Sequence, residues 1–140
     1  MTLTFSSIQP EDLETLAQIW TRGWHQTHAD ICPKALVELR TYASFLDRLS
    51  SFDGDSIVAR QDNAIQGFSL IRANEVYQFF VDRPAQGRGV ARELMNASLQ
   101  RIQNANYTTA VLDCSIGNDM AARFYEKMGW NNTGTHMAEL

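Results

Sequence analysis

Apolar and polar positions follow two periods along this chain, and each period predicts a type of element. Short segments rich in β-branched and aromatic residues are typical of strands and lie at residues 2–8, 56–60, 65–71, 76–81 and 107–114. Segments whose apolar residues recur every three or four positions predict helices, which lie at residues 10–24, 33–39, 41–49, 92–102 and 118–128. The chain therefore combines strands and helices throughout.

Turn residues between the strands predict how the strands pair. Residues 61–64 join two strands as a hairpin, and residues 73–74 make another turn into the strand at residues 76–81. These three strands should form an antiparallel meander. A helix crosses over to the strand at residues 107–114, which should therefore run parallel to the strand before the helix. The segment from Trp130 onward is a candidate for a last strand.

A turn that contains two glycines connects the strand at residues 76–81 to the next helix. Gly87 and Gly89 lack a Cβ, so their backbone N–H groups can approach a ligand closely. The helix that follows begins with unpartnered N–H groups and partial positive charge, which suits a phosphate or pyrophosphate. A tight turn without a ligand is the alternative. The dinucleotide fingerprint needs a small residue where Arg92 stands, and the P-loop needs a lysine after a glycine, so neither pattern is present.

Two motifs lie in the second half of the chain. Gln86, Gly89 and Ala91 form a Gln-x-x-Gly-x-Ala sequence. Asn118 starts 29 positions after Gly89 and begins an Asn-x-x-Ala block that continues into Phe-Tyr-Glu-Lys-x-Gly-Trp. Together they resemble the acetyl-CoA pyrophosphate loop and the second signature of the GCN5-related N-acetyltransferase (GNAT) family. The resemblance covers residues 54–130 and extends to the N-terminal third by pattern.

The resemblance implies a single domain over residues 1–140 with an α/β (α+β) fold. Its central sheet would be mixed and mostly antiparallel, with helices on both faces. Members of the family usually carry two strands after the last helix, but residues 130–140 leave room for one, so the family's final strand is expected to be missing. An open sheet edge invites pairing, which predicts a homodimer that uses this end of the chain.

The resemblance also implies acetyl transfer from acetyl-CoA to an amine of a small molecule, a peptide or a protein by direct attack. The expected contacts to the pyrophosphate are Gln86, Gly87, Arg88, Gly89, Val90 and Ala91. Arg83 and Arg92 would add positive charge, or are solvated surface charges. Family members stabilise the tetrahedral intermediate with a backbone N–H at the end of the strand before the loop, here near Phe80 or Val81. A non-catalytic acyl-CoA sensor or interaction module with the same fold is the alternative.

Three side chains match further roles in the family. Tyr125 is expected to donate a proton to the leaving thiolate, and its alternative role is packing beside Phe124. Asn118 would contact the pantetheine arm and would also cap the last helix. Glu75 is the candidate base that takes a proton from the acceptor ammonium, and its alternative is an exposed acid beside a turn.

In the resembling family, the region after the first helix lines the acceptor pocket. Trp24, His25 and His28 are therefore the expected acceptor contacts, and a polar helix end is the alternative. We expect no metal site, because no third ligand is placed near the two histidines. Cys114 lies in an apolar strand with no histidine near it in the sequence, so we predict a core residue rather than a nucleophile.

Composition limits the classes of partner and the cellular location that we expect. The chain of 140 residues carries a formal net charge of −4, which argues against a general nucleic-acid binder. Its two cysteines cannot form a disulfide framework of the secreted kind, and it shows neither a leader-like N-terminus nor a stretch of transmembrane length. We therefore expect a cytoplasmic protein without membrane contacts. The acidic residues are scattered, so the sequence leaves the acceptor amine open.

Overall fold

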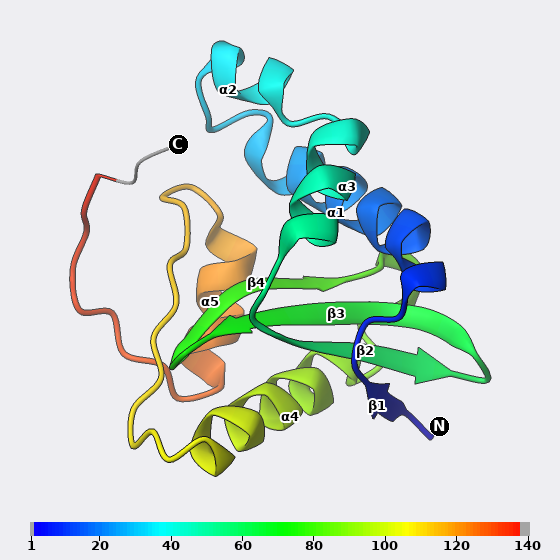
Figure 1. Cartoon of the computed structure of the whole chain (residues 1–140). Helices are drawn as coiled ribbons and strands as arrows, with labels where there is room; N and C mark the ends of the chain where they lie inside the picture. The colour runs from blue at the N-terminus through cyan, green and yellow to red at the C-terminus, as the bar shows by residue number, and fades with distance from the viewer. Residues whose placement is uncertain (1, 138–140) are drawn as a thin grey trace.

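A four-stranded sheet lies at the centre of the computed structural model, which describes residues 2–137 (Figure 1). The strands, in their order across the sheet, are β1 (Thr4–Ser6), β2 (Asp55–Gln61), β3 (Ala64–Arg72) and β4 (Glu75–Val81). All neighbouring strands run antiparallel, which confirms the predicted meander and extends it by β1. The sheet that holds the site is therefore built almost entirely from local hairpins.

Helices cover both faces of this sheet (Figure 1). They are α1 (Leu13–His28), α2 (Lys34–Leu39), α3 (Tyr42–Ser51), α4 (Val90–Asn104) and α5 (Asp119–Lys127). α1 and α3 pack together on one face, whereas α4 crosses the opposite face. α5 lies beside β4, because Phe79 of β4 stacks on Phe124 with ring centroids 6.0 Å apart. None of the helices within residues 2–137 is both long and apolar enough to cross a membrane.

The periodic apolar residues form a core on each face of the sheet. On the side of α1 and α3, Trp20 and Phe45 are fully buried, with ring centroids 4.7 Å apart, and Phe68 of β3 packs beneath them. On the side of α4, Ile57 of β2 and Leu94 are fully buried. Successive side chains of a strand point to opposite faces, so two buried faces demand apolar residues at nearly every position of β2 and β3.

Polar contacts fix where α1 and α3 begin. The Thr41 hydroxyl accepts a hydrogen bond from the backbone N–H of Ser44 at 3.2 Å, so Thr41 caps α3. Before α1, the buried carboxylate of Asp12 accepts from the Arg60 guanidinium of β2 and from the backbone N–H of Gln9. The hydrogen bond from Arg60 lowers the pKa of Asp12, although burial opposes it. This ion pair ties the start of α1 to the sheet.

Both predicted hairpin turns form. Asp62 and Asn63 take φ angles of 51° and 67°, the left-handed conformation that the two central residues of a type I′ hairpin turn adopt. Ala73 takes φ 51° in the turn between β3 and β4. These tight turns set the register of β2, β3 and β4, because a hairpin loop of fixed length allows one pairing.

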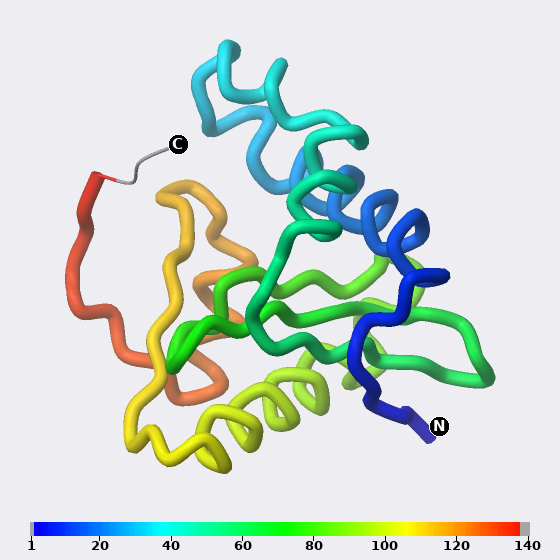
Figure 2. Tube along the Cα trace, in the orientation of Figure 1, coloured from blue at the N-terminus to red at the C-terminus, as the bar shows by residue number. Residues whose placement is uncertain are grey.

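The prediction of a strand at residues 107–114 is wrong. That segment meets β4 through a single parallel bridge between Glu75 and Val111, flanked by two backbone hydrogen bonds of 2.9 Å. Figure 2 shows it passing the turn between β3 and β4 and then leaving the sheet. The physical reason is a bulge in β4 at Tyr77, which bends the strand and ends its pairing with the parallel segment.

Two further predictions about the second half of the chain are wrong. Cys114, expected in the core, is exposed, because no strand pairing holds its segment against the sheet. Residues 130–137 contain no strand, so the last strand expected from Trp130 does not form there, and residues 138–140 lie outside the described part of the chain. The apolar side chain alone suggested a strand, but no neighbouring strand pairs with this segment. The homodimer expected at this end stays a prediction.

Candidate active site

The link between β4 and α4 is a short loop with open space above its backbone. It runs from a 3₁₀ turn at Arg83–Ala85 through Gly87 and Gly89 to Val90, the first residue of α4. Both glycines are left-handed, with φ angles of 79° and 82°, and a Cβ built on either would meet nothing within 4 Å. A ligand can therefore approach the backbone of the loop without meeting a side chain.

The backbone N–H groups in the second half of this loop and at the start of α4 lack partners within the described chain. Within the described chain no N–H from Gly87 to Arg92 donates a hydrogen bond to the backbone, and the first bond of the helix runs from Glu93 to the carbonyl of Gly89 at 3.2 Å. No side chain caps them, and Arg88 and Arg92 are exposed beside them. Free N–H groups at a helix N-terminus, with positive charge around them, suit a pyrophosphate.

The outer edge of β4 is open from its bulge to the loop. Leu70 of β3 lies opposite Gln78, whereas Ile71 lies opposite Val76, so Tyr77 is an extra residue in β4. Beyond the bridge described above, no strand of the described chain pairs with the outer edge of β4. A bound molecule could therefore pair with this edge as a neighbouring strand would.

The register of β4 tells which N–H groups point to this open edge. Asp82 donates to a carbonyl of β3 at 2.8 Å, and hydrogen-bonded positions alternate along an antiparallel strand. The N–H of Phe80 therefore faces β3, whereas those of Phe79 and Val81 face the open edge. The Gln86 side chain donates to the outward carbonyl of Val81 at 3.2 Å, which agrees with this orientation. Of the two donors expected from the sequence, the register favours Val81.

Tyr125 lies on α5, the helix that packs beside this edge. Its ring makes edge contacts with Phe124 and Trp130, at centroid separations of 5.7 and 6.4 Å. Burial, and to a smaller extent the nearby Cys114 thiol, raises the pKa of Tyr125 to about 12. The hydroxyl therefore keeps its proton at neutral pH and is available as a donor.

The other two side chains expected from the family motifs lie at different places. Asn118 accepts a hydrogen bond from the N–H of Ala121 at 3.4 Å, which confirms its role as the cap of α5. Glu75 is half-buried at the first position of β4, opposite Arg72 in the hairpin. The glycine loop follows the last residue of β4, so the length of the strand separates Glu75 from it.

The residues expected to contact an acceptor lie at the C-terminal end of α1. Trp24 is 8% exposed and packs in the core. His28 stacks on Trp24 with centroids 4.9 Å apart, and burial lowers the pKa of His28. His25 donates from Nε2 to the carbonyl oxygen of Arg40. Within the described residues, no group of three or more His, Cys, Asp or Glu side chains gathers as possible metal ligands.

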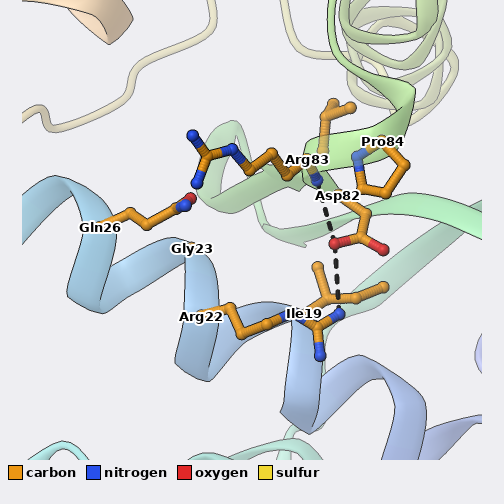
Figure 3. Close-up of a pocket in the computed structure, with 8 residues that line it drawn as sticks. Ile19, Arg22, Gly23, Gln26, Asp82, Arg83 and Pro84 are labelled. Carbon is orange, nitrogen blue, oxygen red and sulfur yellow. Dashed lines mark hydrogen bonds and ion pairs between the residues drawn. The ribbon is translucent and has the colours of Figure 1, made fainter.

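A cavity of about 320 Å³ lies between α1 and the C-terminal end of β4 (Figure 3). Its lining residues are Ile19, Arg22, Gly23, Gln26, Val81, Asp82, Arg83 and Pro84. Arg22 and Asp82 form an ion pair across it at 3.2 Å, and Figure 3 shows the side chains of Gln26 and Arg83 extending toward each other. Val81 belongs to both the cavity and the open edge, so the two features adjoin.

Sequence reasoning missed a set of residues around the bulge of β4. The Tyr77 hydroxyl accepts a hydrogen bond from Arg48 of α3 at 2.8 Å, and the central guanidinium carbon of Arg72 lies 3.9 Å from the centroid of the Tyr77 ring. These side chains come from three separate elements, so no spacing along the chain relates them. Only the folded hairpin and the helix above it bring them together.

By sequence and by fold, the chain is an acetyltransferase-type domain. It belongs to the acetyltransferase (GNAT) domain family, whose model matches residues 28–139. The peptidyl-lysine N-acetyltransferase YjaB of Escherichia coli (strain K12) is 27% identical to it over 135 residues, which cover 96% of this chain and 86% of YjaB.

Solved structures show the same fold. PaiA N-acetyltransferase from Thermoplasma acidophilum, crystallised in complex with coenzyme A, matches with a TM-score of 0.79 and 21% identity, over 97% of this chain and 94% of PaiA. The solution structure of apo YjaB from Escherichia coli also gives a TM-score of 0.79, with 24% identity over 96% of this chain and 86% of YjaB. The predicted GNAT-like fold is thus confirmed.

Proposed function

We propose that this protein is an acetyl-CoA-dependent N-acetyltransferase. The observation that carries the proposal is the continuity between the open edge of β4 and the unpartnered N–H groups of the loop from Gly87 to Arg92. A ligand that has an amide-containing arm followed by a pyrophosphate needs hydrogen-bond donors in the same order, first along a strand edge and then in a loop. PaiA, which has the same fold, was crystallised with coenzyme A, and this supports the same ligand class here.

Backbone groups, more than any one side chain, would hold the pyrophosphate. The residues that we assign to this contact are Gln86, Gly87, Arg88, Gly89, Val90 and Ala91. Arg92, exposed at the first turn of α4, would add positive charge. Asn118 would contact the pantetheine arm from the start of α5. A substituent on either glycine would fill the space through which the phosphates reach the N–H groups.

Three groups would serve the transfer itself. The outward N–H of Val81 would donate to the carbonyl oxygen on which negative charge develops. Glu75 would take the proton of the acceptor ammonium, and Tyr125 would supply one to the leaving sulfur. The C–N bond then forms as the C–S bond breaks. The ammonium loses two protons on its way to the amide: Glu75 would take the first, and the second, lost once the C–N bond has formed, would replace the proton that Tyr125 gives to the sulfur. One proton per turnover then passes from Glu75 to solvent.

The acceptor class that we propose is an amine of a small molecule or of a peptide. YjaB, a relative of this chain, is named as a peptidyl-lysine N-acetyltransferase, so a lysine side chain in a peptide is the first acceptor to assay. His25 and His28 lie at the end of α1 on the sheet face that carries the bulge of β4, and they remain the proposed acceptor contacts. Trp24 would support them from the core.

The test of this function is amine-dependent release of thiol from acetyl-CoA. Wild-type protein should release thiol when lysine peptides or small amines are added, and Gly89→Glu should not, because the new carboxylate occupies and repels the phosphate site. Gly134→Glu is the matched control, since Gly134 is also left-handed, with φ 130°, and has open space at its Cβ position. Acetyl-CoA binding without transfer to any amine would contradict the enzyme function and favour a non-catalytic acyl-CoA sensor.

A further inference from the structure

A cluster of arginines surrounds Tyr77 at the bulge of β4. The arginine cluster consists of Arg40, Arg48 and Arg72, which come from the end of α2, from α3 and from the end of β3. The bulge turns Tyr77 onto the sheet face covered by α1 and α3, where it packs against the core of that face. The transfer chemistry proposed above uses none of these arginines.

Arg48 is held between aromatic side chains. Its guanidinium donates to the Tyr77 hydroxyl at 2.8 Å, and its central carbon lies 4.5 Å from the centroid of the Trp20 ring. This is the one hydrogen bond that the half-buried side chain makes within residues 2–137. A guanidinium carries several N–H donors in a planar fork, so most of them remain for a ligand. The buried Nε1 of Trp20 also lacks a partner there.

Arg72 and Arg40 add charge at the same place. Arg72 is exposed and lies over the Tyr77 ring, whereas Arg40 is half-buried, and burial together with the charge of Arg48 lowers the pKa of Arg40. Burial would raise the pKa of Tyr77, but the hydrogen bond from Arg48 and the charges of Arg48 and Arg72 outweigh it and lower that pKa. Positive charge is thus concentrated at one partly buried point.

No carboxylate neutralises the arginine cluster within the described residues. None of the ion pairs within residues 2–137 includes Arg40, Arg48 or Arg72. Glu75 lies opposite Arg72 in the hairpin, but the two side chains form no ion pair. Like charges held close together in a partly buried place repel one another, and a bound anion relieves that cost.

We infer that the arginine cluster binds a carboxylate of the acceptor, so that the favoured acceptor is an amine that also carries an acid group. The inference rests on the proposed N-acetyltransferase function. His25 connects the expected acceptor region to the cluster, because it donates to the carbonyl of Arg40. Glu75 shares the sheet face of Arg72, so it would receive the proton of the ammonium while the guanidinium groups hold the carboxylate.

Acceptors that carry positive charge alone should be disfavoured by the same residues. A bare diamine or a polyamine would bring ammonium groups toward three guanidinium groups, none of which forms an ion pair with a carboxylate within residues 2–137. A charge-assisted hydrogen bond from arginine to carboxylate changes an equilibrium by roughly tenfold to a hundredfold. We therefore expect a preference of about tenfold or more in kcat/KM for the acid-bearing acceptor.

The test compares amines that differ in a carboxylate. One arm measures kcat/KM for lysine against cadaverine and for tyrosine against tyramine, by thiol release from acetyl-CoA. A second arm uses peptides with one lysine and either glutamate or glutamine beside it. The two arms separate a free amino acid from an acidic peptide as the source of the carboxylate. The expected result, in one arm or in both, is a kcat/KM that is about tenfold or more higher for the acid-bearing acceptor.

Arg72→Gln is the decisive variant, because Arg72 is exposed and its loss leaves the core in place. The variant should lower kcat/KM for the acid-bearing acceptor far more than for the matching amine without a carboxylate, mainly by raising KM. The ratio of the two kcat/KM values should then fall to within about threefold. Arg72→Lys should recover part of the preference, since it keeps the charge. Arg101→Gln on α4, on the opposite face, removes the same charge and should leave the preference unchanged.

Binding provides a readout that does not depend on turnover. Trp20 and Trp24 lie on the face of the arginine cluster, so protein fluorescence in the presence of CoA should respond to lysine at lower concentration than to cadaverine. Equal or better kcat/KM for the bare amines in both arms overturns the inference and leaves the proposed function standing. If acetyl-CoA binds and no amine is acetylated, the proposed function fails, and an equal fluorescence response to lysine and cadaverine then overturns the inference as well.

Discussion

Tyr125 is a phenol in surroundings that disfavour its charged form. Its ring lies among aromatic side chains, and burial raises its pKa to about 12. A higher pKa makes a phenol a weaker acid, but the same desolvation also raises the pKa of a thiolate that leaves beside it. The two groups therefore remain comparable in basicity, and proton donation from Tyr125 to the sulfur stays feasible.

The first prediction concerns the hydroxyl of Tyr125. Tyr125→Phe should lower kcat by about a hundredfold or more, because general-acid catalysis contributes on that scale, while the Kd of acetyl-CoA stays the same. Tyr107→Phe, at an exposed tyrosine of the same chain, is the control and should leave kcat unchanged. An equal loss of kcat in both variants, or none in either, would remove Tyr125 from the proposed chemistry.

The pH dependence of the wild type follows from the raised pKa of Tyr125. An acid must be protonated to act, and a pKa of about 12 keeps this hydroxyl protonated well above neutral pH. The rate should therefore rise from neutral pH to about pH 10, as the acceptor amine loses its proton, without a falling limb from the tyrosine. A fall in rate between pH 8 and 10, in a protein shown to stay folded, would contradict this assignment.

The sequence predicted the roles of some single residues but not the contacts of others. Asn118 was recognisable because a capping asparagine and a family signature coincide at one position, and its cap is confirmed. The loop glycines were recognisable because their left-handed conformation suits few other residues. Arg48 and Tyr77 could not be paired in advance, since 28 intervening residues separate them and only the packing of α3 on the sheet joins them.

At the scale of elements, α1 approaches β4 closely through Gly23. A Cβ at Gly23 would lie 2.7 Å from Cδ1 of the Phe80 ring, which is closer than side chains tolerate. Glycine is a poor helix former, yet α1 continues through Gly23 to His28. The glycine is needed where the helix crosses the strand, and so it sets the distance between α1 and the open edge.

The prediction for this contact is that Gly23→Ala pushes α1 away from β4. Overpacking costs about 1–3 kcal/mol, and better helix propensity returns about 1 kcal/mol, so the free energy of unfolding should fall by up to about 2 kcal/mol. Acetyl-CoA should bind more weakly, measured by calorimetry. The double variant Gly23→Ala with Phe80→Leu should recover both, and Gln18→Ala, exposed on α1, serves as the propensity control.

A second prediction at this scale concerns the ion pair that anchors α1. Asp12→Asn should lower the free energy of unfolding at pH 7 by about 2–4 kcal/mol, because it leaves the mostly buried Arg60 side chain without its counter-charge. Asp55→Asn, in the more exposed pair with Arg101, should cost less than about 1 kcal/mol. Urea unfolding of both variants measures the difference, and equal losses would refute the anchoring role.

The pH dependence of that anchor has a definite sign. The pKa of Asp12 is lowered in the folded protein, so its stabilisation is present above its ordinary pKa of 3.8 and is lost as the pH falls through the lowered value. Wild-type stability should therefore decline below pH 4 more steeply than that of Asp12→Asn. Parallel acid unfolding curves for the two proteins would contradict the lowered pKa.

Elements made from local pairing were predictable, and the one that depends on a distant partner was not. The hairpins that join β2, β3 and β4 follow from short turns and alternating residues. Residues 107–114 carry strand-forming side chains, yet a strand needs a partner edge, and the bulge at Tyr77 turns that edge away. The same bulge creates the open edge of the candidate site, so this wrong strand prediction coincides with the candidate site.

At the scale of the whole molecule, local positive charge matters more than net charge for binding an anionic ligand. The chain carries a formal net charge of −4, whereas acetyl-CoA is itself an anion. In the proposed function, acetyl-CoA would therefore bind through the loop between β4 and α4, where free N–H groups and arginines lie together. Repulsion from the rest of the surface would be weak, because solvent and salt screen charges at a distance.

The overall fold was accessible from the sequence because two motifs fixed the order of its elements. The loop at Gly87–Gly89 and the block from Asn118 define a strand, a helix and a second helix in sequence, and the helices on both faces follow from their apolar stripes. The acceptor side depends on α2, α3 and the ends of strands, which no motif covers. It therefore became visible only when side chains from these elements were seen together.

The measurement that tests the central claim most directly is a calorimetric titration of the purified protein with acetyl-CoA. Wild-type protein and Gly134→Glu should bind with the same Kd, and Gly89→Glu should show no measurable binding, because its carboxylate stands where the loop N–H groups meet the pyrophosphate. Absence of binding by the wild type, or equal binding by Gly89→Glu, would contradict the assignment of this loop and edge as the acetyl-CoA site.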